Sequence, residues 1–174
     1  MASPVALQEN DEPGEVESEI QMIVKPGCPF CDIGQRPEPD TREVYRDEQV
    51  VAFFPTEPAT LGHTLVIPRG HVDTIWNLEE AGAKELAAVT IRLAKAVREA
   101  TGAPGLNVIQ SNGETATQTI MHLHIHLVPR WPHDDLGQIW PRETSYSERQ
   151  KDNVLENVRD SVLRLLVEAD RHDE

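Results

Sequence analysis

The sequence predicts an α+β fold that contains a mainly antiparallel sheet of about five strands, one long central helix and a C-terminal helix. Short runs of β-branched and aromatic residues are separated by turn residues. One long segment between two of these runs has the period of a helix, and most connections are short enough for antiparallel neighbours. With 174 residues, 39% of them hydrophobic, the chain is able to bury a sizeable core.

The expected strands follow from alternating apolar residues and from the turn residues around them. Two short strands are expected within residues 44–54, and single strands over 63–68, 105–110 and 122–128. Because proline lacks a backbone N–H, we expect Pro68 and Pro129 to close two of these strands.

Two helices are expected from capping residues and apolar periodicity. The central helix runs from Asn77, a favourable N-cap, to Gly102, a natural C-terminal stop. Its apolar positions are Leu86, Val89, Leu93, Val97 and Ala100. A last helix covers roughly residues 146–170. Its apolar stripe consists of Val154, Leu155, Val158, Val162, Leu165, Leu166 and Ala169.

The chain is predicted to consist of three parts. Residues 1–21 are acidic and poor in apolar side chains, as is typical of a flexible tail. Residues 22–142 form the domain, and residues 143–174 form a helix that packs on the domain or extends it. The start of the chain does not resemble a signal peptide, and no run of 18 apolar residues occurs, so we expect a cytoplasmic protein.

The charge balance limits the possible partners. Sixteen lysines and arginines stand against thirty acids, which gives a formal net charge of -14. Nucleic-acid polymers and anionic membranes are bound by clustered cations, so neither is an expected partner. DNA-end processing is disfavoured for the same reason. A small anionic substrate needs only a few local donors and stays compatible with this charge.

A row of three histidines is the most informative feature of the sequence. In the strand 122–128, His122, His124 and His126 line one face, while the leucines and isoleucine between them enter the core. A solvent-exposed histidine face or a bare metal site is the alternative. A neutral imidazole is a good nucleophile toward phosphorus, and a neighbouring imidazolium neutralises phosphate or protonates a leaving group.

The two cysteines are separated by two residues. Cys28 and Cys31 have the spacing of a metal-binding knuckle and equally that of a thioredoxin-like redox pair. The spacing alone leaves both interpretations open.

Several short segments resemble one known family. His-Leu-His-Ile-His-Leu-Val at residues 122–128 resembles the signature of the histidine-triad (HIT) family of nucleotide hydrolases and transferases. Further segments resemble this family in the same order along the chain: CPFCDI at 28–33, GHTLVIPRGH at 62–71, NGE at 112–114 and QT at 118–119. The resemblance runs from about residue 26 to 131 and implies the fold and chemistry of the zinc-containing bacterial type.

The resemblance implies catalytic and substrate-binding roles. His124 would attack the α-phosphorus and form a nucleotidyl-histidine, and His126 would bind the phosphate and assist departure of the leaving group. Asn112, Gln118 and Thr119 would bind phosphate oxygens. In addition, an apolar slot for the nucleobase would be formed by Phe30, Ile33 and Phe53, for which ordinary core packing is the alternative.

The resemblance also implies a metal centre and a partner. A structural zinc would be held by Cys28, Cys31, His71 and His122, while catalysis would require no metal. His63 is expected to support a functional residue or to orient a strand, rather than to bind the metal. Relatives commonly pair as homodimers, and we expect the same here.

The sequence departs from the family pattern at two positions. Pro55 replaces the acidic or amide residue that usually binds the ribose, and Thr117 replaces a glycine next to the phosphate site. Trp131 and Trp140, just after the triad, would stack on a base or leaving group or pack in a dimer interface.

The resemblance therefore predicts a nucleotide hydrolase that cleaves a phosphoramidate or phosphoanhydride bond at the α-phosphate and releases a nucleoside monophosphate. A dinucleoside polyphosphate hydrolase or phosphorylase would use the same nucleophile and is the first alternative. The second alternative is a nucleotide-binding module with vestigial activity, which the two departures favour.

Overall fold

A computed structural model describes the backbone of residues 22–172 and the side chains of residues 22–166. The predicted acidic tail, residues 1–21, lies outside the described residues. The chain divides into two compact units, one ending at Leu136 and the other beginning at Gly137. Each unit is described by itself, and the predicted domain boundary between residues 142 and 143 stays a prediction.

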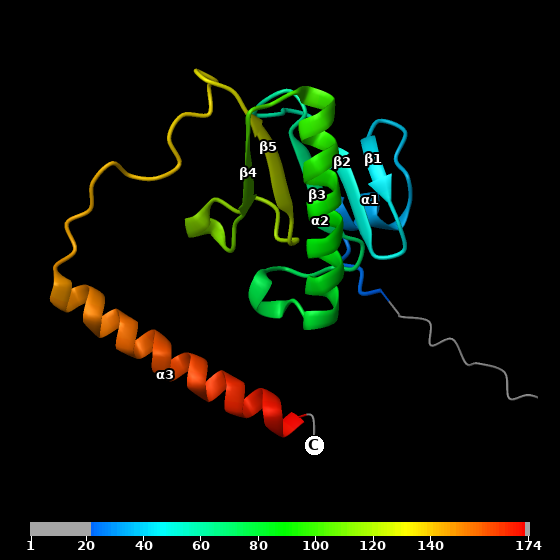
Figure 1. Cartoon of the computed structure of the whole chain (residues 1–174). Helices are drawn as coiled ribbons and strands as arrows, with labels where there is room; N and C mark the ends of the chain where they lie inside the picture. Colours follow the sequence, from blue (N-terminus) through cyan, green and yellow to red (C-terminus); the bar gives the residue numbers. More distant parts are fainter. Residues whose placement is uncertain (1–21, 173–174) are drawn as a thin grey trace, which may run out of the picture. The chain divides into compact units, whose positions relative to one another are not determined.

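The first unit contains a five-stranded sheet with the order β1-β2-β3-β5-β4 (Figure 1). The strands are β1 (Arg42–Arg46), β2 (Val50–Phe54), β3 (Thr64–Pro68), β4 (Gly105–Gln110) and β5 (Ile125–Arg130). All four neighbouring pairs are antiparallel, which confirms the predicted fold class. Because β5 lies between β3 and β4, the segment with the histidine row enters the middle of the sheet.

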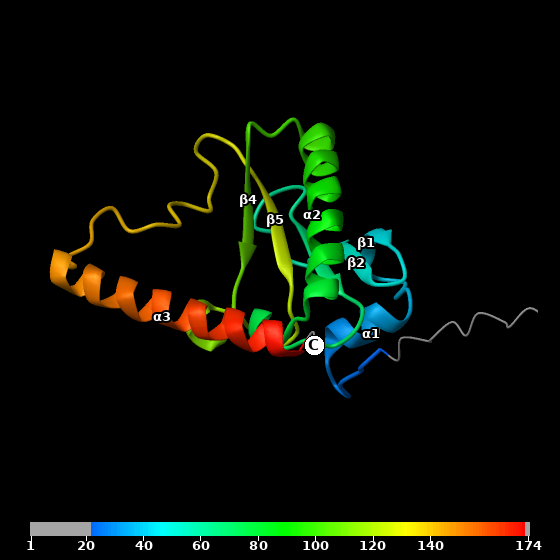
Figure 2. The ribbon, with the colours of Figure 1, turned by 60° about the horizontal axis from the view of Figure 1, so that its bottom comes forward.

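Helices cover both faces of the sheet. Helix α2 (Glu80–Thr101) lies along one face, where it contacts β3 and β5 (Figures 1 and 2). Helix α1 (Pro29–Gln35) contacts β2 and β3. The short 3₁₀ helices η1 (Ile75–Asn77) and η2 (Glu114–Ala116) lie in the loops before α2 and before β5. Helix α1 was not expected from the sequence, because seven residues that begin with proline are too short to show helical periodicity.

The core forms two clusters, one on each face of the sheet. The cluster under α2 joins its buried residues to alternate positions of the strands: Val50, Ala52, Val66, Leu86, Val89, Leu93, Leu123 and Leu127. The cluster under α1 takes the intervening strand positions: Cys28, Phe30, Cys31, Val51, Phe53, Leu65 and Ile67. Since successive side chains of a strand point to opposite faces, β2 and β3 contribute to both clusters.

The start of α2 differs from the prediction. Asn77 ends η1, and Glu79 occupies the N-cap position of α2. The Thr74 hydroxyl donates a hydrogen bond to the Asn77 side chain, so that amide stabilises the turn before the helix. Gly102 ends α2 in the left-handed conformation, as predicted.

The end of the apolar stripe of α2 also differs from the prediction. Ala100 is exposed, whereas Thr101 is half-buried. Thr101 follows Val97 by four residues and therefore lies on the same face of the helix. Its methyl group faces Gly62, which precedes β3.

The strand that carries the histidines begins and ends later than predicted. His122 and His124 precede β5, and only His126 lies within it. The strand continues through Pro129, which pairs with Leu106 of β4. The ladder between β3 and β5 extends only to Leu127. The missing N–H of the proline is therefore tolerated.

The second unit contains α3 (Glu148–His172). The apolar side chains of the predicted stripe from Val154 to Leu166 are exposed. Ala169 lies beyond the described side chains. Packing of this helix on the first unit stays a prediction. No helix in the described part of the chain has the length and hydropathy needed to cross a membrane.

Close packing of α1 on the end of β3 gives a first prediction. A Cβ on Gly34 would lie 2.8 Å from the Arg69 carbonyl oxygen. We expect Gly34→Ala to lower the free energy of unfolding by about 1–3 kcal/mol, even after the gain of about 1 kcal/mol from helix propensity. Urea denaturation measures this change.

Gly70→Ala is the matched control, because a Cβ on Gly70 meets nothing within 4 Å. Equal stability of the two variants would contradict the close contact between α1 and β3.

Candidate metal centre and catalytic histidines

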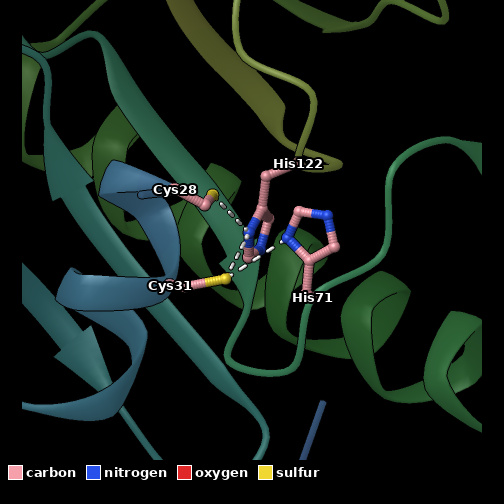
Figure 3. Close-up of side chains that lie close together, drawn as sticks. All are labelled: Cys28, Cys31, His71 and His122. Carbon is pink, nitrogen blue, oxygen red and sulfur yellow. Dashed lines mark hydrogen bonds between the residues drawn. The ribbon is translucent and has the colours of Figure 1, made fainter. Parts of the chain in front are cut away.

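Two cysteines and two histidines from three segments converge beside α1 (Figure 3). Cys28 precedes α1, Cys31 lies within it, His71 follows β3 and His122 precedes β5. Their ligand atoms all lie within 4.8 Å of one another. The Cys31 sulfur lies 3.2 Å from His71 Nδ1 and 3.6 Å from His122 Nδ1, and the Cys28 sulfur lies 3.5 Å from His122 Nδ1. The structure thus brings the four predicted ligands together.

Hydrogen bonds fix the tautomers of the two histidines. His122 Nε2 lies 2.9 Å from the Pro68 carbonyl oxygen, which only accepts, so the ring proton is on Nε2. His71 Nε2 lies 3.0 Å from the Asp73 carboxylate, which likewise accepts. Both rings therefore present the Nδ1 lone pair toward the sulfurs.

This donor set fits a tetrahedral metal ion. In a tetrahedral zinc site, a cysteine sulfur and a histidine nitrogen that bind the same ion lie about 3.6 Å apart. The observed S···N distances are close to this value. Burial raises the pKa of the Cys31 thiol, so a thiolate here requires a cation nearby. Burial lowers the pKa of His122 to about 4, which keeps its ring neutral. The four donors favour the metal-binding interpretation of the cysteines over the redox pair.

The His124 ring is held in place by the backbone of the neighbouring His122. Its Nδ1 lies 2.8 Å from the carbonyl oxygen of His122, so Nδ1 carries the proton and Nε2 presents a lone pair. The side chain is buried, and its ring faces the edge of Phe30 at a centroid distance of 5.3 Å. Burial of His122 and His124 excludes a solvent-exposed histidine face.

His126 is held in the opposite tautomer by a chain of hydrogen bonds. The Ala59 N–H donates to His63 Nδ1 at 3.1 Å, so the proton of His63 is on Nε2. This Nε2 lies 2.9 Å from His126 Nδ1, which must accept. The remaining proton of His126 is therefore on Nε2. His63, expected to support a functional residue or to orient a strand, thus contacts a triad histidine directly.

The rings of His124 and His126 lie next to each other and present different groups at Nε2. Their centroids are 4.9 Å apart. Burial, followed by the nearby His124 and His63, lowers the pKa of His126 to about 4, and burial also lowers the pKa of His63. With both rings neutral, the pair presents one nitrogen lone pair and one N–H donor, which suits nucleophilic attack beside an anionic group.

The loop before the triad is held by its own side chains. Gln118 is buried, and its amide accepts from the Gly113 N–H and donates to the Asp73 and Ile120 carbonyls. Asn112 accepts from the Ile75 N–H. Both amides thus support the loop. Thr119 is exposed, and binding of phosphate by these three residues stays a prediction.

Thr117 has an uncommon backbone conformation, with φ 67° and ψ 24°. This left-handed region favours glycine and is costly for a β-branched residue. Thr117 stands where the resemblance predicts glycine, so the backbone keeps the shape that glycine would allow. The threonine adds strain to the loop before the triad.

The three residues of the predicted nucleobase slot lie in the cluster under α1. Phe30 and Phe53 are buried with ring centroids 5.6 Å apart, and Ile33 packs against the same cluster. Core packing is therefore observed for these residues, and contact with a base stays a prediction. Glu57, two residues after Pro55, is exposed. Trp131 is half-buried and Trp140 is exposed, and their roles stay predictions.

Comparison with known proteins identifies relatives of this chain. The family model of the HIT domain matches residues 36–133. Protein hit of Bacillus subtilis is 33% identical over 143 residues, which are 82% of this chain and 96% of that protein. Adenylylsulfatase HINT3 of Arabidopsis thaliana is 34% identical over 134 residues, which are 75% of this chain and 63% of that protein.

A solved structure adds a metal-bound relative. The crystal structure of a zinc-bound histidine triad family protein from Mycobacterium smegmatis has a TM-score of 0.59 and 32% identity. The match covers 78% of this chain and 97% of that chain.

The low pKa of His126 makes stability depend on pH. The unfolded chain binds a proton at His126 near pH 6.5, whereas the folded protein binds it only near pH 4. The contribution of His126 to the free energy of unfolding is therefore greatest above pH 6.5. It decreases as the pH falls from 6.5 to 4 and does not change further below pH 4. We expect His126 to contribute a loss of about 3 kcal/mol over this range.

Urea denaturation of the wild type and of His126→Gln at several pH values isolates this contribution, because both proteins share the remaining groups. Parallel stability curves would contradict the buried, neutral state of His126.

Proposed function

The chain belongs to the histidine-triad (HIT) family, and on this basis we propose that it is a nucleotide hydrolase that acts at the α-phosphate through His124. The bond cleaved is a phosphoramidate or a phosphoanhydride, and the product is a nucleoside monophosphate. The observation that carries this proposal is the pair of opposite tautomers at His124 and His126, each fixed by hydrogen bonds.

The reaction proceeds in two displacements. The Nε2 lone pair of His124 attacks phosphorus, a P–N bond forms, and the bond to the leaving group breaks with its electron pair on the leaving group. The leaving group of a phosphoanhydride departs as an anion, whereas that of a phosphoramidate takes up a proton from solvent and departs as an amine. The His126 Nε2–H donates a hydrogen bond to a phosphate oxygen. Water then attacks phosphorus, the P–N bond breaks with its electrons returning to His124, and the water proton passes to solvent.

The His122 carbonyl stabilises the intermediate. While phosphorus is bonded to Nε2, the imidazole ring of His124 is positively charged and its Nδ1–H remains 2.8 Å from this carbonyl oxygen. A hydrogen bond from a charged donor is stronger than one from a neutral ring. The same residue that binds the metal thus supports the nucleophile in its charged state.

We further propose that the metal is zinc and that its role is structural. The two thiols and two imidazoles complete a four-ligand site and leave no protein position open for a substrate, as in structural zinc sites. The zinc-bound relative supports this identity. Zinc would connect α1 to the segment after β3, which carries His71, and to the segment before β5, which carries His122.

Loss of the nucleophile gives the decisive test of the activity. We expect His124→Ala to reduce turnover by about 10³-fold or more, because no other group forms the P–N bond. Adenylylsulfate, a nucleoside phosphoramidate and a dinucleoside polyphosphate are the substrates, and release of the monophosphate is measured. Metal content by mass spectrometry should remain that of the wild type.

His133→Asn is the control, because His133 is exposed and asparagine tolerates its positive φ. Substantial turnover by His124→Ala would refute the assignment. A diphosphate product that requires added inorganic phosphate would indicate the phosphorylase alternative. Absence of turnover and of a trapped nucleotidyl-histidine with every substrate would instead indicate a binding module.

We also propose that two copies pair through β4. This strand lies at one edge of the sheet and exposes Val108, and Ile91 of the nearby α2 is exposed as well. The opposite edge, β1, carries charged residues that discourage strand pairing. A second copy would cover the apolar edge with antiparallel backbone pairing.

Light scattering after size-exclusion chromatography tests this pairing. We expect a dimer for the wild type and a monomer for Val108→Lys, since a charge would be buried at the interface. Val44→Lys on the opposite edge is the control and should remain dimeric. A monomeric wild type would contradict the proposal.

A further inference from the structure

We propose that Asp73 is a positioning residue that joins the metal ligand His71 to the phosphate-binding loop. The inference rests on the proposed metal site and on the proposed hydrolase, and no catalytic contact is assigned to Asp73. Its side chain and its backbone contact different parts of the site. The carboxylate contacts the metal centre, and the carbonyl oxygen contacts the loop that precedes the triad.

The carboxylate orients His71. Asp73 Oδ1 lies 3.0 Å from His71 Nε2, while the Nδ1 of the same ring lies 3.2 Å from the Cys31 sulfur. The hydrogen bond holds the proton on Nε2 and makes Nδ1 a stronger donor toward a cation. A carboxylate in this position supports metal ligands in many proteins.

Lys25 contacts both parts of this arrangement. Its ammonium lies 2.9 Å from the same Asp73 oxygen, and its backbone N–H donates to the Cys31 sulfur at 3.4 Å. The ion pair is half-exposed, with 51% and 43% of the two side chains accessible, so its own contribution is small. The hydrogen bond to His71 differs, because only 7% of the His71 side chain is exposed.

The backbone carbonyl of Asp73 holds the phosphate-binding loop. The Gln118 Nε2 donates to this carbonyl at 2.7 Å, and the Gln118 Oε1 accepts from the Gly113 N–H at 2.7 Å. Because Gln118 is buried, these bonds are shielded from water. The Gln118 side chain thereby links Gly113, at the start of the loop, to the backbone of Asp73.

The neighbours of Asp73 reinforce the same connection. The Ile75 N–H donates to Asn112 Oδ1 at 2.7 Å, and the Val72 carbonyl accepts from the Leu123 N–H at 2.6 Å. The segment from Val72 to Ile75 is thus bonded to the start of the loop, to Gln118 and to the triad segment. A shift of His71 therefore moves the groups that are proposed to surround the phosphate.

Metal competition tests the first half of the proposal without any substrate. Zinc-loaded wild type, Asp73→Ala and Asp73→Asn are titrated with a chromophoric chelator. We expect Asp73→Ala to lower zinc affinity about 10–100-fold. Asp73→Asn should lose less, because its carbonyl oxygen still accepts from His71 but lacks the charge. Lys25→Met should change affinity less than threefold or so.

Hydrogen exchange tests the second half on the same zinc-saturated proteins. We expect faster exchange across residues 110–120 in Asp73→Ala, with the Gly113 amide as the most informative site. Asp135→Ala, at an exposed acid, is the control for both measurements. If Asp73→Ala does not fold, Asp73→Asn provides both readouts.

Zinc affinity of Asp73→Ala within twofold of the control would overturn the proposal. Unchanged exchange in residues 110–120 despite weaker zinc binding would overturn the connection to the loop. A loss of zinc affinity in Lys25→Met equal to that in Asp73→Ala would show that the ion pair between Lys25 and Asp73 accounts for the effect. This result would also overturn the proposal. Because zinc binding and exchange require no turnover, these outcomes are independent of whether the proposed hydrolysis occurs.

Discussion

The hydrogen bond between the His124 ring and the His122 carbonyl is the interaction on which the site depends. His122 is fully buried and makes three contacts. Its Nδ1 faces both cysteine sulfurs, its Nε2–H donates to Pro68, and its carbonyl accepts from His124. The position of the proposed nucleophile is therefore set by the same residue that faces the metal site, and neither can shift alone.

Burial of so many polar groups is possible because each has a partner. Among the described residues, no buried side-chain nitrogen or oxygen lacks a hydrogen bond. The histidines, Gln118 and the buried threonines would otherwise each cost the full penalty of desolvation. The hydrogen bonds that satisfy them also fix ring orientation and tautomer. The site is thus organised before a substrate binds, which is where much of the electrostatic stabilisation of a transition state originates.

The acidic character of the chain lies away from this chemistry. From residue 115 to residue 133 the sequence contains no acid. Asp73, the carboxylate nearest to the metal ligands in these contacts, is neutralised by Lys25 and bonded to His71. The environment of His124 and His126 is formed by imidazoles, backbone carbonyls and an aromatic edge. A small phosphate group is therefore not repelled locally, despite the net charge of -14.

The sequence by itself determined the α+β class, the antiparallel sheet and the ends of most strands, because periodicity is a local property. The four candidate metal-site residues followed from the resemblance to the histidine-triad family, since spacing alone left the role of the two cysteines open. Only the tertiary structure decided which nitrogen of each histidine carries a proton. The Pro68 carbonyl and the His63 ring, which set the protons of His122 and His126, are remote in sequence from the triad, and no local pattern marks them. Helix α1 and the left-handed Thr117 were hidden for a related reason. Packing against distant strands and closure of a loop impose conformations that local propensity does not favour.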